Sequence, residues 1–520
     1  MQKQVNLKLT PEHFFDSLIL KKNIASACAC SINNITGFAI NKKSLDARQK
    51  QPWFNIQLTA YINENLPTQL FAKYTFPKPL KNSNVVIIGA GPAGLFAAIE
   101  CLLQGLTPII IERGKNVKDR RRDLATLNKA GIINPESNYC FGEGGAGTYS
   151  DGKLYTRSKK RGDVHKVLEL LVQFGAPQNI LYEAHPHIGT NKLPQIIEAM
   201  RLCILNHGGQ IYFNQKLDDF EINNNLITSV TTHTGKQIYA KYFILATGHS
   251  ASDVFLLLHK KNIAIEAKPF ALGVRIEHPQ QIIDAAQYRC ANKNPLLPPA
   301  AYSWVKQING NGVFSFCMCP GGIIAPASTQ QNKLVVNGWS PSKRNNPFAN
   351  SGIVVTVNQS HWQHLVPQHG ALAALIFQEQ VEEKAYQQGG GLFKAPASRM
   401  VDFCNNKVST TLPTCSYNPG VVAANFNNVL PPFIYNSLQQ AFIAVSKTMP
   451  GYFTNEAIVV ATESRTSSPV KIPRNKDNFQ HITITNLYPC AEGAGYAGGI
   501  VSAAIDGINI ATHIKQTYFY

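Results

Sequence analysis

Three glycines, Gly89, Gly91 and Gly94, have the GxGxxG spacing of dinucleotide-binding loops, and their chemical meaning is the clearest in this sequence. An apolar run at residues 85–88 precedes them, as expected of a buried parallel strand, and a helix is expected from about residue 92 to 103. The first glycine permits a tight turn, the second lets the backbone approach a pyrophosphate, and the third lets the helix pack closely on the strand. Free amides at the helix N-terminus favour the charge of the phosphates. The motif therefore predicts a dinucleotide site.

An acidic residue, Glu112, ends the next apolar run, about 20 residues after the last glycine, where an acid accepts the ribose hydroxyls. Two further features favour FAD over NAD. Residues 244–248, Ile-Leu-Ala-Thr-Gly, have the strand-end pattern of flavoprotein Rossmann domains. The nucleotide-binding pattern also resumes near the C-terminus, where we expect a strand at residues 481–488 and a helix that opens near Gly493. That helix would direct its N-terminus at the flavin, with Glu492 near the ribityl chain or the pyrophosphate.

Two other segments match GxGxxG but lack its context. The glycines at 493, 495 and 498 follow an expected strand, yet no Asp or Glu follows Asp506 to bind a second ribose. The glycines at 142, 144 and 147 follow a polar stretch, residues 134–139, instead of an apolar strand. We therefore predict one dinucleotide site, which the backbone of this last group of glycines could still approach.

The chain resembles a family of bacterial FAD-dependent dehydrogenases of uncharacterised reaction, within the glutathione-reductase-like FAD/NAD(P)-binding superfamily. The resemblance covers most of the chain, and it rests on segments at residues 44–48, 89–94, 141–154, 187–190, 273–279, 316–322 and 492–500. Two positions depart from the family pattern, because Ala491 stands where Gly is expected and Asn191 where Asp is expected. The resemblance implies FAD, an oxidoreductase fold and a glycine-rich segment beside the flavin. It implies no substrate, because one fold supports many reactions.

Together the motifs and the resemblance predict one FAD, bound non-covalently. The expected cofactor-binding residues are Gly89, Gly91, Pro92, Ala93, Gly94, Glu112, Arg113, Gly144, Gly145, Thr148, Ser150, Thr247, Gly248, Glu492, Gly493, Gly498 and Gly499. No metal site is expected, since the eleven cysteines include no CxxC pair.

Four residues are candidates for catalysis, each with a plainer alternative. Lys153 would place a cation near the pyrimidine end of the flavin and stabilise its reduced, anionic form, or it belongs to an ordered loop that faces phosphate. His187 would act as a general acid, or it is hydrogen-bonded near a strand end. Cys317 and Cys319 would form a redox pair, because residues two apart on a strand point the same way, although a disulfide between them would be strained.

The order of elements predicts an α/β fold in four segments. Residues 1–80 are expected to form a small N-terminal β-α-β-β module, and residues 84–263 the first part of a split Rossmann-type FAD-binding domain. Residues 264–446, with short strand-like runs and one helix near 371–388, predict an inserted β-rich (α+β) substrate domain. Residues 447–520 are expected to return to the FAD-binding domain.

Charge leaves the choice of partner open. The net charge is +18, and the first 80 residues carry ten Lys or Arg against four Asp or Glu, which keeps RNA as an alternative partner. Elsewhere the positive charge is diffuse, and the triplet Arg120-Arg121-Arg122 is expected to be a solvated helix face. The N-terminus lacks the apolar core of a signal peptide, and glycines and prolines interrupt the most apolar stretch, so we expect a cytoplasmic chain without a membrane partner. The sequence does not predict an oligomeric state.

The leading expectation is an FAD-dependent oxidoreductase, of dehydrogenase or reductase type. It would pass a hydride through flavin N5 to an unnamed small-molecule substrate, with NAD(P)H as a candidate transient donor. The alternative is an FAD-dependent RNA-modifying or RNA-associated flavoprotein. In that case the basic N-terminal module would help the protein to bind RNA.

Overall fold

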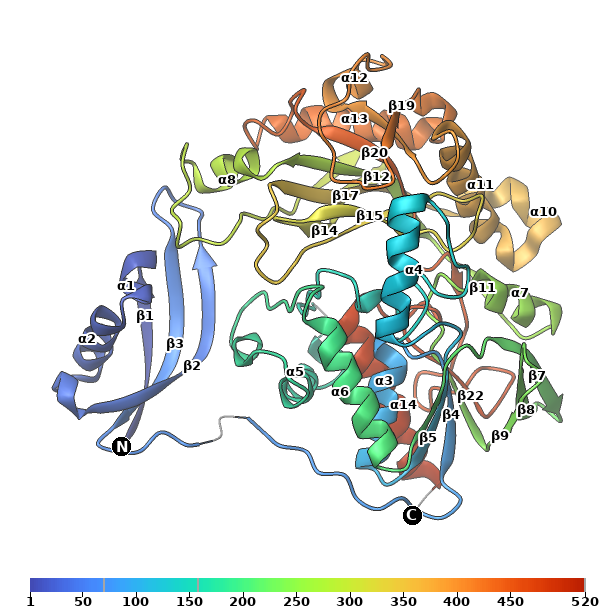
Figure 1. Ribbon diagram of the computed structural model, residues 1–520, viewed down its shortest axis with the longest axis horizontal. Coiled ribbons are helices and arrows are strands. Elements are labelled where there is room, and N and C mark those ends of the chain that lie inside the picture. Colours follow the sequence, from blue (N-terminus) through green and yellow to red (C-terminus); the bar gives the residue numbers. More distant parts are fainter. Residues whose placement is uncertain (69–70, 157–158, 519–520) are drawn as a thin grey trace.

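The computed structural model describes residues 1–68, 71–156 and 159–518. Residues 69–70, 157–158 and 519–520, which fall within three of the predicted segments, lie outside the described residues. Figure 1 shows an N-terminal module that stands apart, a parallel sheet flanked by helices, and a larger sheet above it. The fold is therefore mixed α/β, with a parallel sheet as one of its parts.

The N-terminal module has the predicted β-α-β-β order, with its helical part divided in two. Its strands form an antiparallel sheet in the order β1-β3-β2. The elements are β1 (Gln2–Leu9), α1 (Pro11–Phe15), α2 (Ser17–Cys28), β2 (Ile35–Asp46) and β3 (Trp53–Ile62). Thr10 and Asp16 start the two helices, because their side-chain oxygens accept hydrogen bonds from first-turn amides. Alternate residues of β3, including Phe54, Ile56 and Leu58, are buried in the same cluster as residues of α2.

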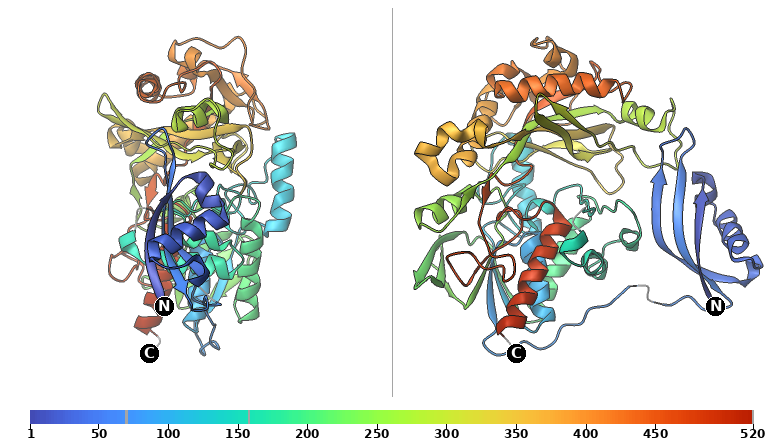
Figure 2. Two further views of the ribbon diagram at one scale, coloured as in Figure 1. Left: turned by 90° about the vertical axis from the view of Figure 1, so that its left-hand side faces the viewer. Right: turned by 180° about the vertical axis from the view of Figure 1, so that it is seen from behind.

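An extended segment leads from this module to the rest of the chain, as the view from behind in Figure 2 also shows. Lys43 of β2 makes one of the contacts between the module and the larger body. The Lys43 ammonium lies 2.7 Å from the Glu183 carboxylate, and the Lys43 backbone exchanges hydrogen bonds with Tyr182 and Ala184. Elsewhere Asn294 donates to the Glu12 carboxylate at 2.6 Å, and Leu45 and Ala47 pack against buried residues of the larger body, so the module is held by several small contacts.

The described residues of the second body include five parallel strands in the order β22-β10-β4-β5-β6, called the parallel sheet below. These strands are β4 (Asn84–Ile88), β5 (Thr107–Ile111), β6 (Gln210–Tyr212), β10 (Tyr242–Leu245) and β22 (Leu487–Pro489). Most of their apolar residues are buried because both faces are covered, as is usual for parallel strands, whereas Ile211 of the edge strand β6 is partly exposed. The last strand comes from the C-terminal end of the chain and completes one edge of the sheet.

The two faces of β4 pack on different partners. Val85 and Ile87 share a buried cluster with one set of helices, and Val86 and Ile88 share another with a small antiparallel sheet and α7. The helices are α3 (Pro92–Leu103), α5 (Val164–Gln173), α6 (Leu193–Asn206) and α14 (Ile500–Tyr518). The elements on the other face are β7 (Leu217–Asn223), β8 (Leu226–Thr232), β9 (Gln237–Tyr239) and α7 (Ser252–Lys260).

Helices α3 and α14, over 380 residues apart in sequence, lie side by side in Figure 1. Gly507 of α14 allows this close approach, because a Cβ added there would lie 2.2 Å from the Ala93 carbonyl oxygen. The C-terminal helix is therefore packed directly on the helix that follows β4.

The third body contains a large sheet, which in the described part of the chain runs in the order β13-β14-β17-β12-β20-β18-β19. Its neighbours pair antiparallel, apart from β18 and β19. The strands are β12 (Phe270–Pro279), β13 (Val305–Ile308), β14 (Asn311–Cys319), β17 (Phe348–Val357), β18 (Ala395–Arg399), β19 (Val421–Ala423) and β20 (Ile458–Glu463). Its main helices are α8 (Gln280–Tyr288), α11 (Ala373–Gln388) and α13 (Pro432–Ser446), with the short α9 (Gln359–Trp362), α10 (Val366–His369) and α12 (Met400–Cys404).

Two features of this body differ from the sequence prediction. Helix α13 was not expected beside α11, although a proline starts it and its apolar residues are buried. Strand β20 lies in the large sheet, whereas the sequence prediction placed residues 447–520 with the cofactor-binding part. The strand is buried throughout and begins with the apolar run Ile458–Ala461. Such a run fits the centre of either sheet, so periodicity alone does not assign it.

The remaining elements are α4 (Val117–Ala130), β11 (Glu266–Ala267), β15 (Ile323–Pro326), β16 (Val336–Trp339) and β21 (Val470–Lys471). Strands β15 and β16 form one two-stranded sheet, and β11 and β21 form another. The carboxyl ends of β4, β5, β10 and β22 lie at one edge of the parallel sheet, where ligands of such sheets bind. Within the described residues, no helix is long and apolar enough to cross a membrane.

Candidate functional site

The predicted glycine loop has a different amount of space at each of its three glycines. Gly89 has φ of 105°, and a Cβ there would lie 2.5 Å from the Ala246 carbonyl oxygen. A Cβ on Gly94 would lie 1.9 Å from the Gly89 carbonyl oxygen. At Gly91 the nearest described atom is 3.9 Å away, in Gly145. The first and third glycines are thus required by packing, and the second faces space that a pyrophosphate could use.

The N-terminus of α3 is open to a ligand. Gly91 is its N-cap and offers no side-chain cap, so the first-turn amides keep their donor capacity. Open space also surrounds Gly248, Gly498 and Gly499, because a Cβ added to any of them would meet no described atom within 4 Å. These glycines border the carboxyl edge of the parallel sheet and the start of α14.

Glu112 lies at the end of β5 and is only 5% exposed. Its Oε2 accepts a hydrogen bond from Ala90 N at 2.8 Å, and its Oε1 accepts bonds from Gly114 N and Gly142 N at 2.9 Å each. The carboxylate therefore joins three loops as well as being the predicted ribose acceptor. A carboxylate has about four acceptor positions, so one remains for a ribose hydroxyl.

Arg113, another predicted cofactor residue, is already engaged by protein groups. Its guanidinium donates to Glu136 at 2.8 Å and to Asp253 at 2.9 Å, and it lies 4.0 Å from the ring centroid of Phe141. Burial alone would lower the pKa of Arg113, but the two carboxylates outweigh it and raise the pKa. Its observed role is to tie three segments together beside the site.

The glycine-rich loop after α4 is organised by Arg120, which corrects the prediction of a solvated basic helix face. Arg120 is fully buried and donates to the Thr148 hydroxyl and to the carbonyl oxygens of Asn138, Tyr139, Glu143 and Gly145. The helical periodicity of the sequence could have indicated this buried role. Residue 120 lies on the face of α4 that includes the buried Val117, Leu124 and Leu127.

The hydroxyls of this loop bond within it. The Thr148 hydroxyl donates to the Glu143 carbonyl at 2.7 Å, and the Ser150 hydroxyl donates to the Gly147 carbonyl at 2.8 Å. The loop meets the fingerprint through its backbone, because Gly144 N donates to the Ala90 carbonyl at 2.8 Å. The prediction that Gly144, Gly145, Thr148 and Ser150 contact the cofactor stays a prediction, and backbone contact is the form that the loop favours.

The C-terminal segment meets the Thr247–Gly248 turn at the same edge. A Cβ on Gly493 would lie 2.7 Å from the Gly248 carbonyl oxygen, and His249 Nε2 lies 3.7 Å from a Glu492 oxygen. Helix α14 begins at Ile500 and not near Gly493, because the intervening glycines turn the chain. Ala491, where the family resemblance predicts Gly, has φ of 58°, in the left-handed region that favours glycine.

These features fit a dinucleotide of the FAD type. Burial lowers the pKa of His249, and its Nδ1 is buried without a hydrogen-bond partner among the described residues. An orphaned polar atom beside a row of open glycines indicates a polar ligand at this edge. Pro92, Ala93, Gly94, Gly248 and Gly498 would surround such a ligand with backbone, and Glu112 would accept from its ribose.

A second group of side chains lies where the glycine-rich loop meets the large sheet. Lys153 Nζ lies 3.7 Å from Cys317 Sγ, 3.6 Å from Cys319 Sγ and 3.5 Å from Asp151 Oδ2. Arg344 donates to the same Asp151 oxygen at 2.9 Å. The structure thus brings together three of the four predicted catalytic candidates. We call these five residues, with Arg275 and Glu463, the thiol cluster.

Arg275 and Glu463 lie beneath the two cysteines. The Arg275 guanidinium donates to Glu463 at 2.6 Å and to the Cys317 carbonyl at 2.7 Å, and it lies 3.7 Å from Cys319 Sγ. Both side chains of this ion pair are buried. Burial raises the pKa of Glu463 to about 7 even with Arg275 lowering it, and the 2.6 Å ion pair with Arg275 is the geometry of a charged carboxylate.

The cluster also sets the protonation of its thiols. Interaction with Cys319 lowers the pKa of Cys317, and interaction with Cys317 raises the pKa of Cys319, whose Sγ donates to the Cys317 carbonyl oxygen at 3.3 Å. Lys153 favours the charged form of both thiols. Burial would lower the pKa of Lys153, but the two cysteines and Asp151 raise it overall. These directions favour a thiolate on Cys317 and a thiol on Cys319 beside a charged lysine.

His187, the fourth candidate, lies at the border of the cluster. It pairs with Lys153 in a short antiparallel bridge, and its Nε2 lies 3.2 Å from the Ser342 carbonyl oxygen. Burial and the nearby Arg344 lower the pKa of His187, so a neutral, hydrogen-bonded imidazole is favoured over a general acid. Asn191, a departure from the family pattern, accepts from Ser342 N at 2.8 Å, a bond that Asp would also make.

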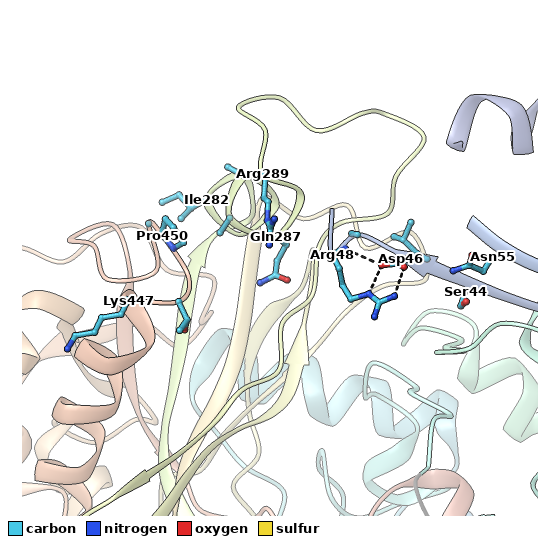
Figure 3. Close-up of a pocket in the computed structure, with 15 residues that line it drawn as sticks. Ser44, Asp46, Arg48, Asn55, Ile282, Gln287, Arg289, Lys447 and Pro450 are labelled. Atoms are coloured by element: carbon cyan, nitrogen blue, oxygen red, sulfur yellow. Dashed lines mark hydrogen bonds and ion pairs between the residues drawn. The ribbon is translucent and has the colours of Figure 1, made fainter. Parts of the chain in front are cut away.

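A separate cavity of about 1170 Å³ lies between the N-terminal module and α8 (Figure 3). Residues 44–48 line one side, and Gln287, Arg289 and Lys447 line the other. Arg48 is paired with Asp46 at 2.7 Å. None of the predicted cofactor residues lines this cavity, so it is distinct from the site at the glycine loop.

The comparisons with families agree with the geometry of the cofactor site. A family described as "FAD binding domain" matches residues 84–119, and "FAD-dependent protein, C-terminal domain-like" matches residues 269–466. A domain of unknown function matches residues 1–61. In the described residues, no group of three or more His, Cys, Asp or Glu side chains is placed to hold a metal ion.

Several solved structures are similar to this chain at low identity and low TM-score. Tetracycline destructase Tet(51) is 11% identical, with a TM-score of 0.35 over 84% of this chain and 83% of that one. CtdE in complex with FAD is 10% identical, with a TM-score of 0.31 over 84% of each chain. Glycine oxidase from Bacillus cereus is 14% identical, with a TM-score of 0.31 over 84% of this chain and 95% of that one. At these values the likeness carries no argument about the reaction.

The fold and the site define an FAD-dependent flavoprotein of the oxidoreductase class. A protein of Clostridium beijerinckii, described as "Uncharacterized protein", is 36% identical over 525 aligned residues, which cover 97% of this chain and 97% of that protein. The chain belongs to the same family as this protein. Identity over nearly the full length includes the N-terminal module, both sheets and the C-terminal helix.

Proposed function

We propose that this chain is a dehydrogenase or reductase that passes a hydride between a small-molecule donor and an acceptor through one non-covalently bound FAD. Its FAD domain would be a split Rossmann-type domain, built on β4, β5, β6, β10 and β22. The large sheet would form the inserted substrate domain. The observation that carries the proposal is the position of β22 and α14, because these C-terminal elements complete the edge at which the glycine loop opens.

The chain's own residues would have distinct tasks in holding FAD. The α3 N-terminus, beside Gly91, would bind the pyrophosphate through backbone amides. Glu112, held by three backbone amides, would accept a ribose hydroxyl without moving. Thr247, Gly248 and Gly493 would present backbone to the flavin end. Bound FAD supplies two-electron chemistry at N5, and the protein orients it and tunes its potential.

Substrate selection would fall to the large sheet. The thiol cluster joins the glycine-rich loop to β14 of this sheet, so its charged groups lie between the two proposed domains. Lys153 is the candidate cation there. With 36% of its side chain exposed, it could meet a ligand without a rearrangement of the fold.

Cofactor content is the first test. Purified full-length protein should be yellow and release close to one FAD per chain on denaturation, with FMN, NAD or no chromophore as the results that would refute the proposal. Gly91→Val should lose FAD. Gly37→Val is a matched control in the N-terminal module, where an added Cβ would meet only Leu66 at 3.4 Å.

A second test addresses the electron donor of the flavin and the possible RNA partner. Reduction of the bound flavin is followed with NADH and with NADPH, beside a salt titration of RNA binding. Lys43 and Arg48, two of the basic residues that an RNA-binding module would use, are paired with Glu183 and Asp46, which favours a small-molecule substrate. Salt-sensitive submicromolar RNA binding without flavin reduction would overturn the proposal, because release of counterions makes such binding strongly salt-dependent.

A further inference from the structure

The thiol cluster contains two cysteines that share one cation. Both sulfur atoms lie within 4 Å of Lys153 Nζ, and Cys319 Sγ also lies 3.7 Å from the Arg275 guanidinium. Such contacts stabilise a thiolate, which is the nucleophilic form of cysteine. Two thiols beside two cations are an arrangement for sulfur chemistry, which packing alone does not require.

Formal charge within the cluster supports a thiolate. Lys153, Arg275 and Arg344 carry three positive charges, and Asp151 and Glu463 carry two negative ones. One further negative charge balances this buried group, and a thiolate shared by the cysteines supplies it. Asp151 stays charged, because Lys153 and Arg344 outweigh the effect of burial and lower its pKa.

The two cysteines differ in access. Cys317 is partly exposed, whereas Cys319 is fully buried. Lys153 reaches the pair from the solvent side, with 36% of its side chain exposed. A reagent that enters beside Lys153 would meet Cys317 first, and Cys319 would lie behind it as a second thiol.

The strand is irregular at this point. On a regular strand, residues two apart have Cα atoms separated by about 6.6–6.8 Å, close to the upper limit for a disulfide. Cys317 has φ of 47°, and the pairing of β14 with β17 shifts register between Phe316 and Cys319. The backbone therefore departs from the geometry that makes an i, i+2 disulfide unfavourable. Any remaining strain would leave the bond easily reduced, as a reversible site needs.

We propose that Cys317 and Cys319 form a thiolate–thiol pair that reduces disulfides. The Cys317 thiolate attacks one sulfur of a disulfide RSSR, which forms a Cys317–S–S–R bond and releases RS⁻. The Cys319 thiol then loses its proton and displaces the second RS⁻, which takes up that proton and leaves as RSH. The products are a Cys317–Cys319 disulfide, RS⁻ and RSH, so two electrons pass from the pair to the substrate. Lys153 is the positioning residue that holds the thiolate charge.

The test uses an aromatic disulfide, 5,5′-dithiobis(2-nitrobenzoate), with full-length protein purified with its FAD. The wild type should release two chromophoric thiolates from this site and keep no aryl group. A peptide containing both cysteines should have a mass lower by two hydrogens, and dithiothreitol should restore it. Cys319→Ser should release one thiolate and keep a mixed disulfide on Cys317. Cys30→Ser, in the N-terminal module, is the matched control and should behave as the wild type.

The role of Lys153 is tested separately, by the rate of the reaction with the aromatic disulfide. Lys153→Met should lower the rate at pH 6.5 about tenfold, equivalent to a thiolate pKa raised by one unit, and Lys153→Arg should restore most of it. A pH profile of the wild-type rate gives the same information if the methionine variant fails to fold. A mixed disulfide that Cys319 never resolves, or a Cys317 rate no faster than that of Cys30, would overturn the proposal. FAD content is measured on every sample, so failure here with FAD retained leaves the proposed function standing.

Discussion

Replacement of Glu112 tests the role of a buried carboxylate that serves both the fold and the cofactor. Glu112→Ala removes the acceptor of three backbone amides, at Ala90, Gly114 and Gly142. A buried donor left unsatisfied costs about 1–3 kcal/mol of stability. Water that enters the space left by the side chain can bond these donors and recover part of this loss. We therefore expect a local opening free energy lower by roughly 3–6 kcal/mol.

The variant Glu112→Gln separates these three bonds. Gly114 and Gly142 share Oε1, whereas Ala90 alone bonds Oε2. The amide oxygen of Gln can keep the first two bonds, but its NH₂ group would then face Ala90 N as a second donor. Only the fingerprint loop should loosen, at a cost of about 1–3 kcal/mol.

Hydrogen exchange on the flavin-free protein measures this difference by segment. Peptides that contain Ala90, Gly114 and Gly142 should all lose protection in the alanine variant, whereas the glutamine variant should expose the Ala90 peptide alone. Asp253→Asn is the control, since this carboxylate is 40% exposed and bonds the Arg113 side chain, not one of the three amides. FAD affinity should fall about 10–100-fold in the alanine variant, the equivalent of roughly 1–3 kcal/mol. Equal loss of protection in both variants, or no loss in either, would refute the reasoning.

Three further predictions follow from single positions. Gly91→Val should abolish FAD binding. It should leave the thermal midpoint of the flavin-free protein within a few degrees of wild type, because the nearest described atom to an added Cβ is 3.9 Å away. Retention of FAD would show that the phosphate site lies elsewhere. Gly507→Leu should displace α14 from α3 and release FAD, since its Cβ would meet the Ala93 carbonyl oxygen at 2.2 Å; unchanged FAD content would show that this helix contact is not needed for binding. Burial lowers the pKa of His278 to about 4, below its unfolded value of about 6.5. The unfolded chain therefore binds the extra proton first, and the free energy of unfolding falls by about 3 kcal/mol as the pH drops from 6.5 to 4. Unfolding midpoints between these pH values should depend on pH less steeply in His278→Gln, and an unchanged slope would contradict the assignment.

Local patterns in the sequence predicted the elements that build the cofactor site. The apolar runs at 85–88 and 108–111 form β4 and β5, and the proline at position 92 starts α3. The N-terminal order was also predicted, because a capping hydroxyl and a following proline mark its first helix. FAD as the cofactor is confirmed at the level of family, whereas the individual contacts to it stay predictions.

Long-range pairing was not predictable in the same way. Strand β20 and helix α13 have apolar patterns that fit several environments, and only their neighbours decide where they lie. Lys153 and Cys317 are 164 residues apart, and neither segment contains a signal for the other. The sequence therefore indicated these residues as candidates but could not place them together.

Arg120 shows how a local rule can point the wrong way. Three consecutive arginines indicate a solvated surface by composition, yet successive residues of a helix point about 100° apart and need not share an environment. One of the three arginines is fully buried, and its five donors are spent on the loop that runs from Asn138 to Thr148. The same loop contacts Gly91 at Gly145 and continues to Lys153. A single guanidinium therefore holds the segment that links the proposed phosphate site to the thiol cluster, and its loss should disturb both.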